Sequence, residues 1–340
     1  MTAARKALAD QLGVPAKNVI FTSGGTESDN LAILGHLQTL RGKGEVLYTA
    51  AEHAAVKNAC REAEARFGCK AVEIPLTREG SVDLEALEGM LSENTAMICV
   101  MQVCNETGVI MPIAEIGKVC RERGVLFHTD AVQAVGHVPI DVKAMNIDML
   151  SLSAHKFHGP KGVGALYMKK GIRLPSYVMG GAQERNRRAG TENVAGIVGL
   201  GAAIALATQT LEESAARMTK LRDKLIAGIA QRIPEVKLNG HPTMRLPNNV
   251  NYSIKYIEGE SILLMLDMNG IAASSGSACT SGSLDPSHVL LALGLSHEVA
   301  HGSVRLTLSD ETTEEDIDYV LDVLPKVAER LRAMSPLYHA

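Results

Sequence analysis

The chain has 340 residues, of which 46% are hydrophobic and 21% charged, and its net charge is −4. These values are typical of a globular enzyme with one large core or two domains, and they exclude an extended basic surface for nucleic acid or anionic lipid. Tryptophan is absent and aromatic residues make up 3%, so we expect an aliphatic core.

The six cysteines form no Cys-x-x-Cys pair and no spacing of a secreted disulfide framework. The N-terminus lacks an apolar signal region. The longest apolar run, from Val194 to Ala207, is too short to span a bilayer, and we interpret it as a buried helix. We therefore expect a cytoplasmic protein that binds neither membrane nor nucleic acid.

Short aliphatic runs alternate with helical patterns along the first two-thirds of the chain. The expected strands are 19–22, 45–49, 71–74, 96–103, 125–129, 149–153 and 164–168. The expected helices between them include 29–40, 53–66, 84–91 and 113–123. This alternation predicts an α/β fold with a mostly parallel seven-stranded sheet flanked by helices. In such sheets ligands bind at the carboxyl ends of the strands.

After about residue 210 the pattern changes to a charged helix over 211–232, followed by strands at 249–254, 271–274 and 303–307. A final amphipathic helix begins near Thr312, with Glu315 three residues later as a capping box. The sequence thus predicts a large domain over 1–210 and a smaller C-terminal α+β domain over 211–340.

The turn Gly24-Gly25-Thr26 follows the first strand and precedes a helix. Glycines allow close approach of the backbone to an anion, and a helix N-terminus supplies unpaired N–H groups. A strand–turn–helix junction also needs glycine for structural reasons alone. Phosphate binding and a plain junction therefore both remain open.

The segment from Ser151 to Lys156 is interpreted as a buried strand that ends in a lysine. A desolvated lysine loses part of its preference for the charged form and can react with a carbonyl cofactor. The neighbouring Ser153 and His155 can bind a phosphate. A cofactor with both an aldehyde and a phosphate is pyridoxal 5′-phosphate.

Other polar residues follow apolar strands. Asp130 is either a helix N-cap or a carboxylate that keeps a pyridine nitrogen protonated, with Gln133 near the ring hydroxyl. His53 is either a cap or an imidazole that stacks on the ring and moves protons. Asn105 is either a turn former or a donor to ring or substrate.

Two further residues lie in the last third. Cys279 lies in a stretch of Ser and Gly residues, where a thiol is accessible and a reactive role is favoured over inert packing. Arg305 alternates with apolar neighbours, so its side chain either points to solvent or binds a substrate carboxylate in a bidentate manner.

Together these residues resemble the NifS/IscS-type cysteine desulfurases, which belong to the class V aminotransferase group of fold-type I pyridoxal-phosphate enzymes. The resemblance runs from about Ala4 to the C-terminal helix. The matching segments, in the family's order, are 23–30, 128–133, 153–156, 188–193, 274–279 and 302–305. The sequence around Cys279 is more similar to NifS than to the selenocysteine-lyase branch.

The resemblance implies a role for each matched residue. Lys156 is the Schiff-base lysine, Asp130 pairs the pyridinium nitrogen, Gln133 meets the ring hydroxyl, and His53 stacks on the ring. The phosphate is held by Gly25, Thr26, Ser153 and His155, and Thr191 reaches the phosphate of a partner subunit. Asn105 and Arg305 hold the substrate carboxylate, and Asn105 also contacts the cofactor.

The resemblance also implies the reaction and the partners. L-cysteine gives up its sulfur to Cys279, which then carries a persulfide, and L-alanine leaves. The expected partners are a second copy of the chain and an iron–sulfur scaffold or sulfur-carrier protein. The Cys279 persulfide is expected to contact iron–sulfur species transiently.

One departure from the family concerns the N-terminus. Family members carry a segment reading roughly Leu-Asp-Asn-Ala-Ala-Thr-Thr ahead of the helix that starts near Ala3, and we expect this chain to lack it. The alternatives that stay open are a selenocysteine lyase, a related class V aminotransferase, and a catalytically silent remnant that only binds partners.

Overall fold

The computed structural model describes residues 1–275 and 285–338, which form two compact units. The first unit contains Met1–Pro75, Val82–Val103 and Met111–Leu211, and the second contains Leu76–Ser81, Cys104–Ile110 and Glu212–Ala340. Two short segments of the first 210 residues therefore cluster with the second unit, although nothing in the sequence pattern indicates this.

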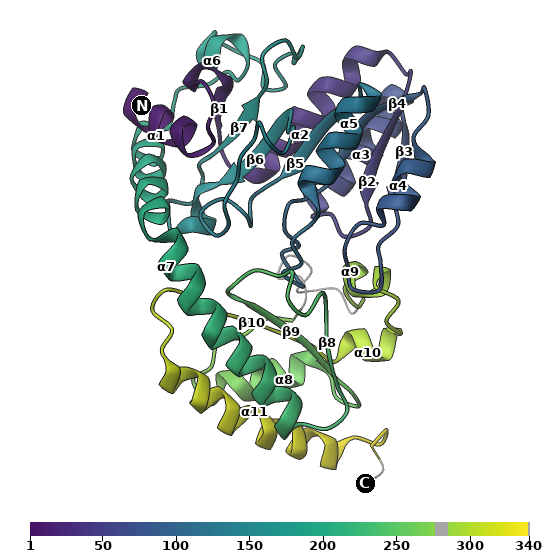
Figure 1. Ribbon diagram of the computed structural model, residues 1–340, viewed down its shortest axis with the longest axis vertical. Helices are drawn as coiled ribbons and strands as arrows, with labels where there is room; N and C mark the ends of the chain where they lie inside the picture. The colour runs from purple at the N-terminus through teal and green to yellow at the C-terminus, as the bar shows by residue number, and fades with distance from the viewer. Residues whose placement is uncertain (276–284, 339–340) are drawn as a thin grey trace. The chain divides into compact units, whose positions relative to one another are not determined.

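The first unit is built on a seven-stranded sheet with the order β1-β7-β6-β5-β4-β2-β3 (Figure 1). Strands β2 to β6 pair in parallel, whereas β7 is antiparallel to both of its neighbours, β1 and β6. The mostly parallel sheet expected from the sequence is confirmed. The strands are β1 Val19–Thr22, β2 Glu45–Thr49, β3 Lys70–Ile74, β4 Thr95–Cys99, β5 Leu126–Asp130, β6 Met149–Ser153 and β7 Gly164–Met168.

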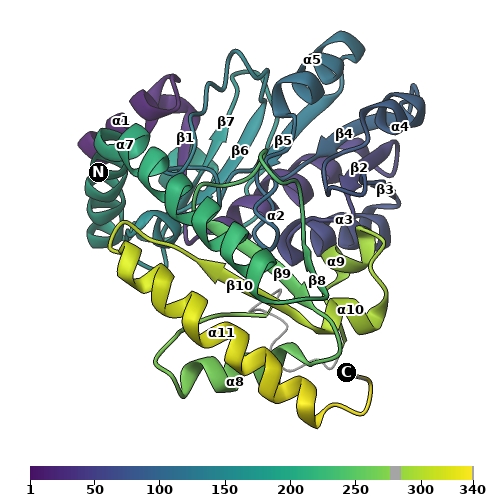
Figure 2. The same cartoon turned by 60° about the horizontal axis from the view of Figure 1, so that its bottom comes forward.

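Helices cover both faces of this sheet. Figures 1 and 2 show α2 and α3 on one face and α5 on the other. The helices of this unit are α1 Thr2–Gln11, α2 Gly25–Leu37, α3 Ala54–Phe67, α4 Leu84–Met90, α5 Ile113–Arg123 and the short α6 Gln183–Asn186. Single 3-10 turns are η1 Ala16–Asn18, η2 Gln38–Leu40 and η3 Ala154–Phe157.

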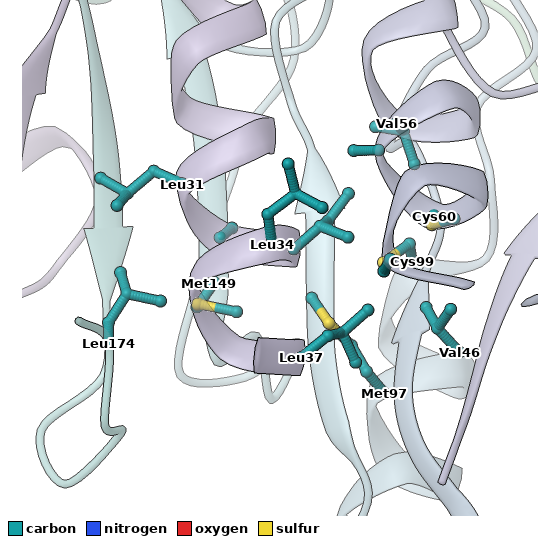
Figure 3. Packing of buried hydrophobic residues seen from close by; sticks show 14 of the residues in the cluster. Leu31, Leu34, Leu37, Val46, Val56, Cys60, Met97, Cys99, Met149 and Leu174 are labelled. Atoms are coloured by element: carbon teal, nitrogen blue, oxygen red, sulfur yellow. The ribbon is translucent and has the colours of Figure 1, made fainter. Parts of the chain in front are cut away.

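The core between α2, α3 and the sheet is aliphatic, as the composition predicted (Figure 3). Leu31, Leu34 and Leu37 recur along α2 at helical spacing and are almost fully buried in one cluster that includes Met97 and Val46 of the sheet. Burial of each such side chain stabilises the fold by about 1.5–3 kcal/mol relative to exposure. This packing fixes the N-terminal end of α2 at the carboxyl ends of the central strands.

The second unit is a three-stranded antiparallel sheet with helices. Its strands are β8 Val236–Leu238, β9 Asn249–Ile254 and β10 Ser303–Thr307, in the order β10-β9-β8. Its helices are α8 Gly259–Asp267, α9 His288–Ala292, α10 His297–His301 and α11 Glu314–Met334. Leu225 and Ile229 pack with Leu321 and Leu324 of α11 in one buried cluster.

Two local expectations are wrong in this unit, and one strand was not expected. The residues 271–274 form no strand, and only Ser274 makes a bridge, to Arg305. The capping box of α11 uses Thr313 and Asp316, one position later than expected. The sequence did not predict β8, because three residues are too few to show an alternating pattern.

The helix α7 also differs from the expectation. It runs without a break over Val194–Arg232, so the apolar run at its start is not a separate short helix. Ile197, Leu200 and Ile204 are buried, as expected. Val194, Val198 and Leu206 are exposed, so the run is buried on one face only. By length and composition alone, α7 is long and apolar enough to cross a membrane. The apolar run is therefore part of a helix longer than the run itself.

Candidate active site

The connection between β1 and α2 forms a narrow turn. A Cβ atom on Gly25 would lie 2.6 Å from Val132 Cγ2 and 3.8 Å from Ser153 Cβ, so the turn, β6 and the segment after β5 meet here. The residue before α2, Gly24, offers no side-chain cap. The first N–H groups of α2 and the positive end of its dipole therefore face this turn, and Thr26 lies in the first helical turn.

The end of β6 supplies polar groups to the same place. Ser153 Oγ lies 2.9 Å from His155 Nδ1, and a Cβ on Gly24 would lie 3.6 Å from Ser153 Oγ. Burial, and then the charges of Lys156 and Lys161, lower the pKa of His155. A neutral imidazole and a hydroxyl thus stand beside the uncapped helix end.

Lys156 does not lie on a strand. The strand β6 ends at Ser153, and Lys156 belongs to the 3-10 turn η3, where it is exposed. The expectation of a buried, desolvated lysine is therefore wrong for this chain. The backbone carbonyl of Lys156 lies 2.8 Å from His137 Nε2, which helps to fix the turn.

Asp130 is the last residue of β5, and its Oδ1 accepts the Val132 N–H at 2.9 Å. No α-helix follows Asp130, so the helix N-cap alternative is wrong. Burial raises the pKa of this carboxyl, while the Val132 N–H and the charges of His53 and Lys156 lower it. The carboxylate therefore lies within electrostatic reach of both. Gln133 is half-buried in the following turn.

His53 is the N-cap of α3, where its Nδ1 accepts the Ala55 N–H at 3.1 Å. Of the alternatives raised by the sequence, the cap is thus confirmed. His53 also lines, with Thr26, a cavity of about 500 Å³ next to α2 and α3. Asp130, Ser153 and Lys156 do not line this cavity.

These groups fit pyridoxal phosphate. The uncapped start of α2, with Ser153 and His155 beside it, suits a phosphate dianion. The buried Asp130 carboxylate, whose pKa is raised by burial, suits a cationic ring nitrogen, because a positive partner favours its ionised form. Lys156 provides an amine for the aldehyde. All of these side chains lie in the first unit.

Behind Asp130 lies a set of buried polar side chains that the sequence did not single out. This set, called the buried cluster below, consists of Asp29, Glu52, His128 and Ser151. His128 Nε2 lies 3.1 Å from Ser151 Oγ and 3.5 Å from Asp29 Oδ1. The signal that could have revealed it is the polar His128-Thr129-Asp130 run at the end of an apolar strand.

Burial shifts each titratable group of the buried cluster toward its neutral form. Burial, and next the charge of Asp130, raise the pKa of Asp29 well above its usual value. Burial raises the pKa of Glu52 to about 8, and it lowers the pKa of His128 to about 3. Asp130 is therefore surrounded by uncharged neighbours on its buried side.

The second unit brings together Asn105 and Arg305. Arg305 donates through Nη1 to the Asn105 carbonyl at 2.7 Å, and it pairs with Asn251 across β10 and β9. Its Nε is buried without a hydrogen-bond partner in the described part of the chain. A carboxylate would satisfy that donor.

The two remaining predicted residues, Thr191 and Cys279, have no described contact with the groups above. Thr191 is exposed in the segment between α6 and α7. Cys279 lies outside the described residues, so its predicted role stays a prediction.

The chain matches the family described as Aminotransferase class-V over residues 1–320. It is 54% identical over 338 residues to the cysteine desulfurase IscS of Clostridium botulinum strain Hall, covering 98% of this chain and 85% of that protein.

Two solved structures extend the comparison. One, named NifS-like protein, is 34% identical with a TM-score of 0.89, and the match covers 96% of this chain and 87% of that one. The other, named SspA in complex with cysteine, is 33% identical with a TM-score of 0.78, and the match covers 92% of this chain and 87% of that one.

Proposed function

Because the chain belongs to the class V aminotransferase family, we propose that it is a cysteine desulfurase that uses pyridoxal phosphate to transfer the sulfur of L-cysteine to Cys279. The observation that carries this proposal is the set of groups around Asp130. The phosphate cradle is the turn before α2 together with Ser153 and His155. This cradle, the amine of Lys156 and the buried carboxylate of Asp130 lie at the ends of β1, β6 and β5, all in one unit.

Each described residue has a task in this reaction. The start of α2, with Ser153 and His155, binds the phosphate. Asp130 would hold a proton on the ring nitrogen, and the cofactor would supply an electron sink for the substrate carbons. Lys156 would hold the cofactor's aldehyde and would accept and return the substrate's α-proton. His53 orients the ring from the start of α3.

The sulfur transfer balances without an added oxidant. A bond forms between the Cys279 sulfur and the substrate sulfur, and the substrate Cβ–S bond breaks. The electron pair of the broken bond passes to carbon, which takes a proton, so that alanine leaves. The thiol of Cys279 becomes a persulfide, and the substrate carbon is reduced by the same two electrons.

Substrate selection is assigned to the second unit. The unsatisfied Nε of Arg305 and the polar Asn105 would hold the carboxylate of an amino acid. The cysteine named in one similar solved structure supports L-cysteine as that amino acid. The names of the curated relatives support iron–sulfur cluster assembly as the destination of the sulfur, with a scaffold or carrier protein as acceptor.

We also propose a homodimer in a reducing, cytoplasmic environment. The exposed apolar side chains at the start of α7 (Val194, Val198 and Leu206) provide a surface that a second copy would cover. Thr191 lies just before this surface, which suits the role of reaching a partner's phosphate. The five cysteines in the described residues are free and buried, which supports a reducing compartment.

The visible spectrum of the purified protein, before and after addition of L-cysteine, tests the proposal. We expect absorbance of lysine-bound pyridoxal phosphate in the wild type, and its loss in Lys156→Ala. Cys279→Ala should keep this absorbance and release no sulfide from cysteine. Undiminished sulfide release by Cys279→Ala would remove Cys279 from the mechanism, and a colourless protein that still binds a scaffold would favour a silent remnant.

A further inference from the structure

The segment from Glu184 to Arg188 makes two ion pairs, one with Arg5 of α1 and one with Glu27 in the first turn of α2. Glu184 accepts two hydrogen bonds from Arg5, both at 2.7 Å, and one from the Phe21 N–H at 3.1 Å. Arg188 donates to both carboxylate oxygens of Glu27, at 2.7 and 3.0 Å. The turn that precedes α2 is thus held from one side by a single short segment of chain.

Glu27 lies where acidic residues are favoured, at the positive end of a helix. It lies in the first turn of α2, and its Oε2 accepts the Ser23 N–H at 2.9 Å. Burial raises the pKa of Glu27, but the bonds from Arg188 and Ser23 outweigh burial, so the pKa is lowered overall. An ionised carboxylate therefore stands at the same helix end that is suited to a phosphate.

We propose that Arg188 is a positioning residue that neutralises Glu27 and so allows the turn over residues 23–27 to hold a phosphate dianion. The inference rests on the proposed function, because the anion is the phosphate of the cofactor. Without Arg188, the negative Glu27 would compete with the phosphate for the positive helix end and for the N–H groups of the turn.

Arg188 acts through Glu27 in this proposal and does not act as a phosphate ligand. Its guanidinium uses a planar bidentate contact on the carboxylate, which lysine cannot reproduce. The Glu27 carboxylate then holds the Ser23 N–H, which fixes the turn. The proposed role of Arg188 concerns the charge of this turn, which the pair keeps balanced.

The test is a titration of the full-length apoprotein with pyridoxal phosphate, followed by absorbance, for Arg188→Gln, Glu27→Gln and the double variant. We expect Arg188→Gln to weaken binding by about tenfold or more, as expected when one partner of a partly buried pair is removed. Glu27→Gln should stay close to the wild type, and the double variant should recover most of the loss, because the uncompensated charge is gone.

Two controls make the outcome specific. Arg187→Gln removes the same charge one position away and should bind like the wild type. Pyridoxal, which lacks the phosphate, should bind Arg188→Gln and the wild type equally. If Arg188→Gln does not fold, Arg188→Lys keeps the charge without the bidentate contact, and it should bind pyridoxal phosphate with an intermediate affinity.

Three outcomes overturn the inference. A double variant as weak as Arg188→Gln would make Arg188 a direct phosphate ligand. A Glu27→Gln variant as weak as Arg188→Gln would make the pair a structural brace without an electrostatic role. If Arg188→Gln loses equal affinity for pyridoxal and for pyridoxal phosphate, the pair is likewise a structural brace. If the wild type itself does not bind pyridoxal phosphate, the proposed function fails instead.

Discussion

Two carboxyl groups on α2, only two residues apart, have opposite pKa shifts. The pKa of Glu27 is lowered, although burial opposes this, because Arg188 and the Ser23 N–H favour its ionised form. The pKa of Asp29 is raised well above its usual value, because it is buried beside other acids without a cation. Beside the cradle, the charge of Glu27 is kept and is paired with Arg188. In the buried cluster, the titratable groups are shifted toward their neutral forms.

The difference shows how the same residue type serves two purposes. On the cradle side, an ion pair shapes a site for an anion. In the buried cluster, neutral groups leave Asp130 as the acid that can ionise, because His53 and Lys156 lie within electrostatic reach of it. The following predictions test this division, beginning with the largest expected effect.

Removing a cation from a paired carboxylate should destabilise the fold most. Arg5→Met leaves Glu184, whose side chain is only 4% exposed, without its partner. We expect a loss of about 3–5 kcal/mol in the free energy of unfolding. Urea denaturation measures it. Lys6→Met on the same helix breaks an exposed pair with Asp10 and should cost less than about 1 kcal/mol. Equal losses of stability in the two variants would show that the buried Glu184 does not depend on Arg5.

Asp130 and Asp29 should respond differently to the same substitution. Asp130→Asn removes the buried acid that is proposed to pair with the ring nitrogen of the cofactor, and we expect kcat for alanine formation to fall about 100-fold or more. Asp29→Asn replaces an acid that is already neutral, so kcat should change far less. Steady-state kinetics at saturating cofactor compares them. A larger loss in Asp29→Asn would reverse the roles.

The pH dependence of stability should have opposite signs for Glu52 and Glu27. The folded-state pKa of Glu52 is raised from 4.5 to about 8, so the fold binds this proton more tightly than the unfolded chain does. Its contribution is favourable below pH 4.5 and is lost as the pH rises toward 8. Glu52→Gln should remove this decline, with a gain on the order of 2 kcal/mol at pH 8.

Glu27 has a lowered pKa, so its contribution is present above pH 4.5 and is lost as the pH falls through the folded-state pKa. Glu27→Gln should therefore be less stable than the wild type at neutral pH, and the two proteins should become equally stable in acid. Urea midpoints between about pH 2.5 and pH 9 give both profiles. Parallel profiles for the two variants would contradict the comparison.

The smallest effect should come from the shape of the cradle. Gly25→Ala places a methyl group 2.6 Å from Val132 Cγ2, which forces a local shift. We expect a loss of about 1–2 kcal/mol in stability and weaker binding of pyridoxal phosphate. Gly89→Ala in α4 is the control, because nothing lies within 4 Å of its Cβ position, and it should stabilise the helix slightly. Calorimetry with and without cofactor measures both.

The sequence predicted the sheet well because its strands are short apolar runs with clear boundaries. Strands β1, β2, β6 and β7 have the bounds that were expected, whereas 271–274 fails because one bridge at Ser274 is not a strand. The continuity of α7 was missed because its apolar start and charged end have different compositions although one helix contains both.

The sequence predicted where some candidate residues lie on the fold, but not their electrostatics. Asp130 and Ser153 stand at strand ends, where the motif indicated them. The exposure of Lys156 and the neutral state of Asp29 depend on neighbours that are distant in the chain, such as Glu52. The partnership of Arg188 with Glu27 could not be predicted, because no periodic pattern relates residues so far apart.

The antiparallel pairing of β1 has a consequence for biosynthesis. In the described part of the first sheet, β1 pairs only with β7. The first strand of this sheet to be synthesised can therefore pair only after the last one has been synthesised. The ribosome must therefore release residues up to Met168 before the turn after β1 can take its final place. A nascent chain arrested earlier would lack the cradle, so cofactor capture must follow translation of this whole sheet.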